Sequence, residues 1–281
     1  MNLPEQPVRS YLYAPGDDRR KIEKAFASEA DAVVLDLEDA VAPNRKEQAG
    51  ETVARVLESE PEKPVFVRVN PVGTELWAAD VDAVAVRNLA GLRLPKTETV
   101  ESVRLVAETL EGLGSEARIQ CLIESALGLE RVFEIATSHE RVAGISLGEA
   151  DLSADLGVGD ETGLLYARSR IVSAARAAAL PHPVQSVYTI IHDLDGLRHS
   201  TEAGKKLGFV GRSTIHPSQV PVVNDVFTPT EEEVSEAEGL LGRLGSEAAS
   251  GTGAFVLEDG RFVDRAVVES ARLTLALARG R

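Results

Sequence analysis

Two carboxylates follow short apolar runs that have the character of buried strands. Glu124 ends the run IQCLIES, and Asp151 ends the run VAGISLGEAD. Oxygen ligands of this kind suit Mg²⁺, which keeps several of its positions for water and substrate. We therefore predict a magnesium site at Glu124 and Asp151. A structural interpretation is also open, in which the two acids pair with Arg68 or Lys96, or Asp151 caps the segment that follows it.

Further charges lie at the ends of two other apolar runs. Arg68 lies in the run VFVRVN, and the run AVVLDLED ends in Asp36, Glu38 and Asp39. Beside a metal, a guanidinium can hold a carboxylate or a developing enolate oxygen through paired hydrogen bonds. Arg68 is therefore a candidate for substrate binding and catalysis, and Asp36 and Glu38 are candidates for support behind the metal ligands. The alternative is that Arg68 is the ion-pair partner of these acids.

Basic residues follow the first apolar run of the chain. In YAPGDDRRKIEKA, Gly16 precedes a helix start, and Arg19 and Lys24 come shortly after it. Helix N-termini and cationic side chains attract phosphate groups. We predict that Arg19 and Lys24 dock a phosphate-bearing ligand, although a solvated helix face would show the same pattern.

The elements that must position these residues alternate regularly along the chain. Eight short β-rich runs are separated by segments of helical composition, as expected of βα units in a parallel sheet. Eight strands each followed by a helix close most naturally as a (β/α)8 TIM barrel, whose reactive groups lie at the C-terminal ends of the strands. An open doubly wound sheet is the rival architecture. The runs are residues 10–15, 32–39, 65–70, 91–96, 118–125, 142–151, 183–189 and 209–217.

The remainder of the chain has a different character. We predict a barrel domain over residues 1–228 and a C-terminal helix, connector and lid over residues 229–281. Residues 231–244 have the composition of an acidic helix, and the stretch GSEAASGTG indicates a mobile connector. The segment AFVLEDGRFVD is typical of a hairpin around Asp259 and Gly260, and a closing helix is expected from Arg265.

Composition narrows the classes of function. A chain of 281 residues with 43% hydrophobic residues can bury a large core. Its formal net charge of -15 disfavours nucleic acids and anionic membranes as partners, because both would be repelled. Cys121 is the only cysteine, which excludes an intrachain disulfide, and no leader or membrane span is recognisable. We therefore expect a cytoplasmic protein that acts on small molecules.

The ordered set of motifs resembles one known family. RSYLYAPGDDRRKIEKA, VVLDLEDAV, VFVRVN, LPK, IES, SLGEADLSADLG and GFVGRSTIHPSQV follow in the order seen in the citrate lyase beta chain and malyl-CoA lyase family. The tail GAFVLEDGRFVDRAVVESA is similar to that family's C-terminal lid. The resemblance covers nearly the whole chain, and the ordered set is specific although each motif alone is weak.

The resemblance implies a (β/α)8 barrel that assembles into trimers or hexamers and uses Mg²⁺ with an acyl-CoA thioester or an acyl carrier. Glu124 and Asp151 match the metal ligands, with Glu124 also beside the substrate, and Arg68 matches the substrate-binding arginine. Asp264 matches the lid aspartate that serves a neighbouring subunit as acid or base. Arg19 and Lys24 would then bind the phosphates of CoA.

The implied reaction is reversible carbon–carbon cleavage of a 3-hydroxyacyl thioester into acetyl-CoA and a 2-oxo acid. Departures from the family pattern, such as GEADL in place of GAEDL and Arg212 in place of lysine, leave the choice among citryl, malyl and citramalyl thioesters open. Two other functions are also considered: a CoA-independent metal aldolase, and a non-catalytic binding or scaffold subunit of a citrate lyase complex.

Overall fold

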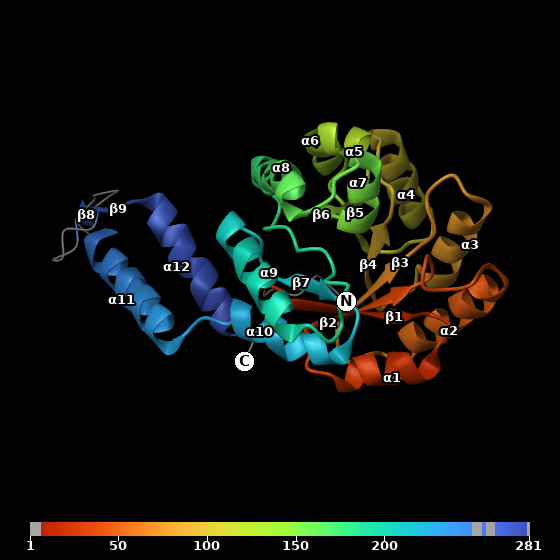
Figure 1. Ribbon diagram of the computed structural model, residues 1–281, viewed down its shortest axis with the longest axis horizontal. Helices are drawn as coiled ribbons and strands as arrows, with labels where there is room; N and C mark the ends of the chain where they lie inside the picture. The colour runs from red at the N-terminus through yellow and green to blue at the C-terminus, as the bar shows by residue number, and fades with distance from the viewer. Residues whose placement is uncertain (1–6, 249–254, 257–261, 280–281) are drawn as a thin grey trace. The chain divides into compact units, whose positions relative to one another are not determined.

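The computed structural model describes residues 7–248, 255–256 and 262–279, and it divides into two compact units, Met1–Asn224 and Asp225–Arg281. The first unit contains a parallel sheet with helices around it (Figure 1). Its strands are β1 (Ser10–Pro15), β2 (Ala32–Asp36), β3 (Val65–Arg68), β4 (Leu89–Leu94), β5 (Arg118–Ile123), β6 (Val142–Leu147) and β7 (Arg212–Thr214).

Helices connect these strands in the order that the sequence predicts. The α-helices of this unit are α1 (Arg19–Ala27), α2 (Lys46–Glu58), α3 (Glu75–Val84), α4 (Val100–Gly112), α5 (Ala126–Glu130), α6 (Val132–Ala136), α7 (Glu149–Leu156), α8 (Leu165–Ala177) and α9 (Leu194–Leu207), and α10 (Val220–Phe227) crosses the boundary between the units. Short 3₁₀ helices are η1 (Pro43–Arg45), η2 (Glu161–Leu164) and η3 (Pro217–Gln219).

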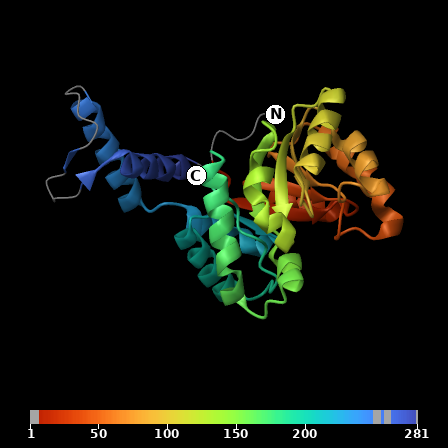
Figure 2. The ribbon, with the colours of Figure 1, turned by 90° about the horizontal axis from the view of Figure 1, so that it is seen from above.

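The sheet has the order β6-β5-β4-β3-β2-β1-β7, and every described pairing in it is parallel. This order never reverses, whereas a doubly wound sheet reverses its strand order at a switch point. With right-handed crossovers, an unreversed order places all the helices on one face and curls the other face inward. Figure 2 shows the curled sheet from a second direction. The doubly wound alternative is therefore wrong.

The two faces of the sheet bury different side chains, because successive residues of a strand point in opposite directions. On β2, Val33 and Leu35 belong to the large apolar core, whereas Val34 belongs to a smaller cluster with Tyr11 and Phe66. The smaller cluster fills the inside of the curl. Polar side chains lie farther toward the C-terminal ends of the same strands, where Asp36 pairs in register with Arg68.

The seventh expected strand, residues 183–189, is not a strand in the structure. It contributes one bridge, between Gln185 and Arg212, supported by backbone hydrogen bonds to the segment before β7. On the side of β6, the Ser186 hydroxyl accepts a hydrogen bond from the Glu149 amide instead of a backbone partner. Pro181 and Pro183 lack the amide hydrogen that a ladder requires. The described sheet therefore has seven strands, not eight.

The second unit contains α11 (Glu231–Ala248), the antiparallel pair β8 (Phe255–Val256) and β9 (Phe262–Val263), and α12 (Arg265–Ala278). Val263 and Val268 are buried against Leu240 and Leu241, which holds the two helices together. The helices predicted at residues 231–244 and from Arg265 are confirmed, and the first extends to Ala248. The end of the predicted connector and the hairpin turn at Asp259 and Gly260 lie outside the described residues. Within the described residues, no helix has the length and apolar character needed to cross a membrane.

Candidate active site

A cavity of about 1040 Å³ opens at the C-terminal ends of the strands in the first unit. It collects most of the residues that the sequence predicts to be functional. Those among its lining are Lys24, Asp36, Arg68, Glu124 and Asp151. Arg19 is not part of the lining; its side chain is exposed and pairs with Glu23 at 3.0 Å.

Glu124 follows the last residue of β5 and is 6% exposed. Its Oε2 accepts a hydrogen bond of 2.8 Å from the Lys96 amide. In the described part of the chain, no lysine or arginine forms an ion pair with this carboxylate. Burial raises the pKa of Glu124 to about 7, and the charges of Glu38 and Asp151 act in the same direction. Glu124 is therefore a buried acid that has no ion-pair partner among the described residues.

The end of β6 is shaped to receive that side chain. Gly148 is the residue before α7, and a β-carbon at this position would overlap the carboxylate of Glu124. Asp151 lies in the first turn of α7, exposed to the cavity, so it does not cap the helix as one interpretation of the sequence suggested. Within the described residues, neither acid forms the ion pair with the side chain of Arg68 or Lys96 that the structural interpretation required; Lys96 contacts Glu124 through its backbone amide.

Arg68 ends β3 and is held by the acids of the DLED turn. Its Nε and Nη2 donate to the two oxygens of Asp36 at 2.8 and 2.6 Å, and its Nη1 lies 2.9 Å from Glu38. Burial works to lower the pKa of Arg68, but the hydrogen bonds and charge of Asp36 raise it well above its usual value. Arg68 is therefore the ion-pair partner of Asp36 and Glu38, as the alternative interpretation of the sequence predicts. The same guanidinium also lines the cavity.

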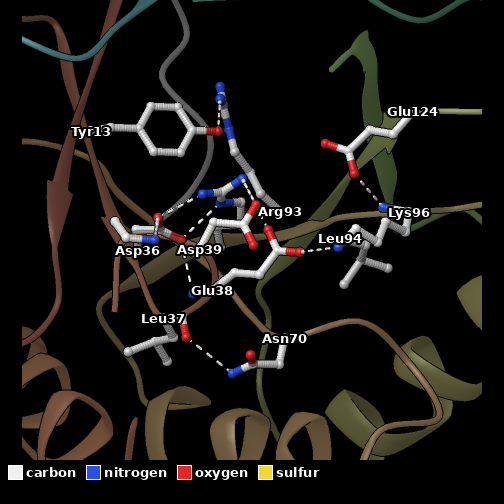
Figure 3. A network of polar contacts seen from close by, with 12 residues as sticks. Tyr13, Asp36, Leu37, Glu38, Asp39, Asn70, Arg93, Leu94, Lys96 and Glu124 are labelled. Atoms are coloured by element: carbon white, nitrogen blue, oxygen red, sulfur yellow. Dashed lines mark hydrogen bonds and ion pairs between the residues drawn. The ribbon is translucent and has the colours of Figure 1, made fainter. Parts of the chain in front are cut away.

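The DLED turn is fixed from behind by backbone and side-chain contacts. The carboxylate of Asp36 accepts hydrogen bonds from the amides of Glu38 and Ala40. Lys46 Nζ donates to the carbonyl oxygens of Leu37 and Glu38, each at 2.8 Å. Asp36 and Glu38 therefore position Arg68, and Figure 3 shows this network with Asn70 below it.

Glu38 is almost fully buried between two cations. It lies 2.9 Å from Arg68 and 3.3 Å from Lys96. Desolvation is the largest influence and raises its pKa, while the positive charges of Arg68 and Lys96 lower it. Glu149, the other acid of GEAD, forms a bidentate pair with Arg168 at 2.8 and 2.7 Å. These two acids are therefore neutralised by protein cations, in contrast to Glu124.

Among the cavity residues, Tyr13 and Arg93 were not identified from the sequence. Lys21, which belongs to the same basic segment as Arg19 and Lys24, lines the cavity beside Lys24. Tyr13 and Arg93 also line it, and they are joined by a hydrogen bond of 2.9 Å. A charged residue inside the apolar run GLRLPK was the available signal for Arg93. Among the described residues, no group of three or more His, Cys, Asp or Glu side chains is arranged to hold a metal.

Asp264 lies in the second unit, directly before α12. It is exposed, and its Oδ1 accepts a hydrogen bond of 3.2 Å from the Val267 amide in the first turn of that helix. This contact shows how the helix start fixes the aspartate. Its predicted catalytic role stays a prediction.

The fold and cavity define an α/β protein with a small-molecule site at the carboxyl ends of parallel strands. Residues 9–217 match the model of the HpcH/HpaI aldolase/citrate lyase family. The chain belongs to this family, in agreement with the resemblance seen in the sequence.

Relatives and solved structures agree with this assignment. A (3S)-malyl-CoA thioesterase of Cereibacter sphaeroides is 35% identical, over 97% of this chain and 95% of that protein. A citrate lyase subunit beta of Leuconostoc mesenteroides is 32% identical, over 98% and 94%. The structure is similar to CitE of Mycobacterium tuberculosis in complex with magnesium, acetoacetate and coenzyme A, with a TM-score of 0.78, 31% identity and coverage of 97% of this chain and 98% of that one.

Proposed function

We propose that this protein is a Mg²⁺-dependent carbon–carbon lyase. Its substrate would be a 3-hydroxyacyl thioester such as citramalyl-CoA, malyl-CoA or a citryl thioester, and its products acetyl-CoA, or an acetyl carrier, and a 2-oxo acid. The observation that carries the proposal is the cavity that Glu124, Asp151 and Arg68 line together, in which Arg68 pairs with Asp36 and Glu38 instead of these two acids. The magnesium and coenzyme A of the Mycobacterium tuberculosis structure support it.

The two carboxylates fit a magnesium ion. Glu124 is buried, accepts one backbone hydrogen bond and lies near Asp151, whose charge helps to raise its pKa. Mg²⁺ takes one or two protein carboxylates and obtains its other oxygens from water and substrate. When bound, the ion would supply a Lewis acid for the substrate's oxygens.

Arg68 would stabilise the electron-rich thioester. In the cleavage the hydroxyl gives its proton to solvent and its oxygen becomes the carbonyl oxygen of the 2-oxo acid. The bond between that carbon and its neighbour breaks, and its electron pair forms the thioester enolate. Because Asp36 and Glu38 hold the guanidinium rigidly, Arg68 can present its positive charge to the enolate oxygen without reorganising.

The second unit would act as a lid in this proposal. Asp264 as an acid gives one proton to the enolate carbon and completes acetyl-CoA; in the reverse direction it removes that proton. We further propose that residues 183–189 complete a closed barrel and that the protein assembles into trimers or hexamers. A cytoplasmic location also stays a prediction.

The basic residues of α1 would hold the phosphates of CoA. Lys24 and Lys21 line the cavity with exposed ammonium groups, and Lys24 lies in the last turn of the helix. Arg19 would contribute from outside the cavity lining. Exposed cations of this kind attract phosphates through their charge while remaining solvated.

The proposal is tested by incubating the purified protein and Mg²⁺ with a panel of such thioesters and following acetyl-CoA, free CoA and oxo acid by chromatography. We expect equal amounts of acetyl-CoA and oxo acid, and no turnover when magnesium is chelated. Free CoA without acetyl-CoA would identify a thioesterase, as in the Cereibacter relative. Cleavage of free hydroxy acids would identify a CoA-independent aldolase, and no product from any substrate would indicate a binding subunit.

A further inference from the structure

Arg93 is a buried cation inside the curl of the sheet. It lies on β4 in register with Arg68 of β3, so the two side chains leave the same face of the sheet. Arg93 is 1% exposed, yet it lines the cavity. Arg93 therefore places a positive charge inside the curl, because a guanidinium is always charged in proteins.

The partners of Arg93 are all neutral. Its Nε donates to Gln120 Oε1 at 2.8 Å, and its Nη1 donates to the hydroxyls of Tyr13 at 2.9 Å and Ser213 at 3.1 Å. Its guanidinium carbon also lies 4.4 Å from the centre of the Tyr11 ring. Within the described residues, no carboxylate forms an ion pair with Arg93, and buried charges normally have such a partner.

Three buried or half-buried acids near Arg93 bind other arginines, and the two that do not, Glu124 and Asp151, are the proposed magnesium ligands. Figure 3 shows the Arg93 side chain extending toward Tyr13 and away from the acids of the DLED turn. Asp36 and Glu38 bind Arg68, and Glu149 binds Arg168. Arg93 is therefore a buried positive charge of the cavity that no carboxylate of the described residues contacts.

We infer that Arg93 binds a second carboxylate of the substrate, carried by the part that leaves as the 2-oxo acid. This inference rests on the proposed function and narrows its substrate class to thioesters that yield a 2-oxo dicarboxylate. Arg93 would then determine specificity, because a methyl group or hydrogen in place of the carboxylate would leave the guanidinium buried and unpaired.

The distances allow one small molecule to reach both arginines. The guanidinium carbons of Arg68 and Arg93 each lie 5.4 Å from the centre of the Tyr13 ring, so they are separated by at most twice that distance. Within this limit, the thioester oxygen of one small acyl group can lie at Arg68 while its second carboxylate lies at Arg93. Tyr13 thus forms the wall that both ends of the ligand would contact.

The test uses two ligands that differ only in the second carboxylate, malate and 2-hydroxybutanoate. Their binding to the full-length protein in the presence of Mg²⁺ is measured by isothermal titration calorimetry. The wild-type protein should bind malate at least tenfold more tightly. A tenfold preference is the size that hydrogen bonds to a charged group account for. Arg93→Met should therefore remove the preference for malate and leave the affinity for 2-hydroxybutanoate within about twofold of the wild-type value.

Arg55→Met is the matched control for the loss of one positive charge. Arg55 is exposed on α2 and lies 3.9 Å from Glu51, so its replacement should leave the preference for malate intact. If Arg93→Met fails to fold, a crystal structure of the wild-type protein with Mg²⁺ and malate decides. A carboxylate within hydrogen-bonding distance of Arg93 supports the inference, and a carboxylate bound elsewhere overturns it.

Three further outcomes overturn the inference: equal binding of the two ligands by the wild-type protein, no binding of malate, or an undiminished preference in a folded Arg93→Met variant. None of these measurements contains a thioester. An inactive protein that prefers malate would therefore contradict the lyase proposal alone, and an active lyase without this preference would contradict the role of Arg93 alone.

Discussion

The two proposed metal ligands differ in their surroundings. Asp151 is exposed to the cavity on the first turn of α7, whereas Glu124 is 6% exposed at the end of β5. Desolvation raises the pKa of Glu124 to about 7, and the backbone hydrogen bond from Lys96 offsets part of this effect. A proton and a magnesium ion would therefore compete for Glu124 near neutral pH.

We predict that magnesium affinity falls as the pH is lowered through about 7. The sign follows from the raised pKa: below it Glu124 is protonated and neutral, and above it the carboxylate is free to bind the cation. Isothermal titration with Mg²⁺ at a series of pH values between 5.5 and 8.5 measures the effect. Glu124→Gln should bind weakly at every pH. An affinity that stays constant over this range in the wild-type protein would show that Glu124 is not a ligand.

Functional side chains could be predicted from the sequence where a charged residue ends an apolar run. They were missed where the charged residue lies inside such a run. Glu124, Asp151 and Arg68 were identified because charge at the end of a buried strand requires a partner. Arg93 lies inside such a run and was overlooked. The pairing of Glu149 with Arg168 joins residues 19 positions apart on α7 and α8, and sequence spacing alone could not indicate it.

At the scale of elements, the end of β6 determines where the side chain from β5 can lie. Gly148 provides the space that the Glu124 carboxylate occupies, and its amide donates to the carbonyl of Ile123. Any β-carbon at position 148 would displace the carboxylate. The backbone of Gly148, with φ of -98°, is accessible to alanine, so the space is the only constraint.

We predict that Gly148→Ala weakens magnesium binding by about ten- to a hundredfold, the range found when a residue that orients a metal ligand is changed. Gly144→Ala is the matched control on the same strand, because its added β-carbon would have its nearest neighbour at 3.8 Å, an ordinary contact. Titration calorimetry measures the affinities, and thermal melting shows whether both variants are folded. Equal affinities for the two folded variants would contradict the positioning role of Gly148.

The elements themselves were largely predictable, and the exception has a local cause. The strand expected at residues 10–15 has the predicted bounds as β1, and the helix start expected after Gly16 is α1, which begins at Arg19. Residues 183–189 have strand-like composition, but Pro183 cannot donate a backbone hydrogen bond. Amino-acid composition indicates which residues favour a strand. Whether a strand forms also depends on backbone amides that can donate hydrogen bonds to the two neighbouring strands.

At the scale of the whole molecule, the two units contribute different parts of the proposed site. The first unit contains the cavity, and in the proposed function the second unit would supply Asp264, which lies at the start of α12. The family resemblance implies that this aspartate acts in the cavity of a neighbouring subunit. Such an arrangement makes activity a property of the oligomer, because each site would combine residues from two chains.

We predict that two inactive variants, Arg68→Met and Asp264→Asn, recover activity when they are co-expressed in equal amounts with different tags and all oligomers are purified together without selection by tag. In a random mixture, about a quarter of the sites combine an intact Arg68 with an intact Asp264 from the neighbour. Acetyl-CoA release should therefore reach about a quarter of the wild-type rate. Asparagine can keep the hydrogen bond that aspartate accepts at the start of α12, so the fold should be unaffected.

The matched control for this experiment is Glu269→Gln on α12, which also removes one acid from the second unit and should retain full activity alone. Glu269 is exposed and pairs with Arg272 at 2.9 Å, so its loss has little structural effect. Capture of a sample through one tag and detection of the other tag establishes that the oligomers are mixed. If mixed oligomers are no more active than either variant alone, Asp264 does not act across subunits, because sites built within one chain would always lack one of the two residues.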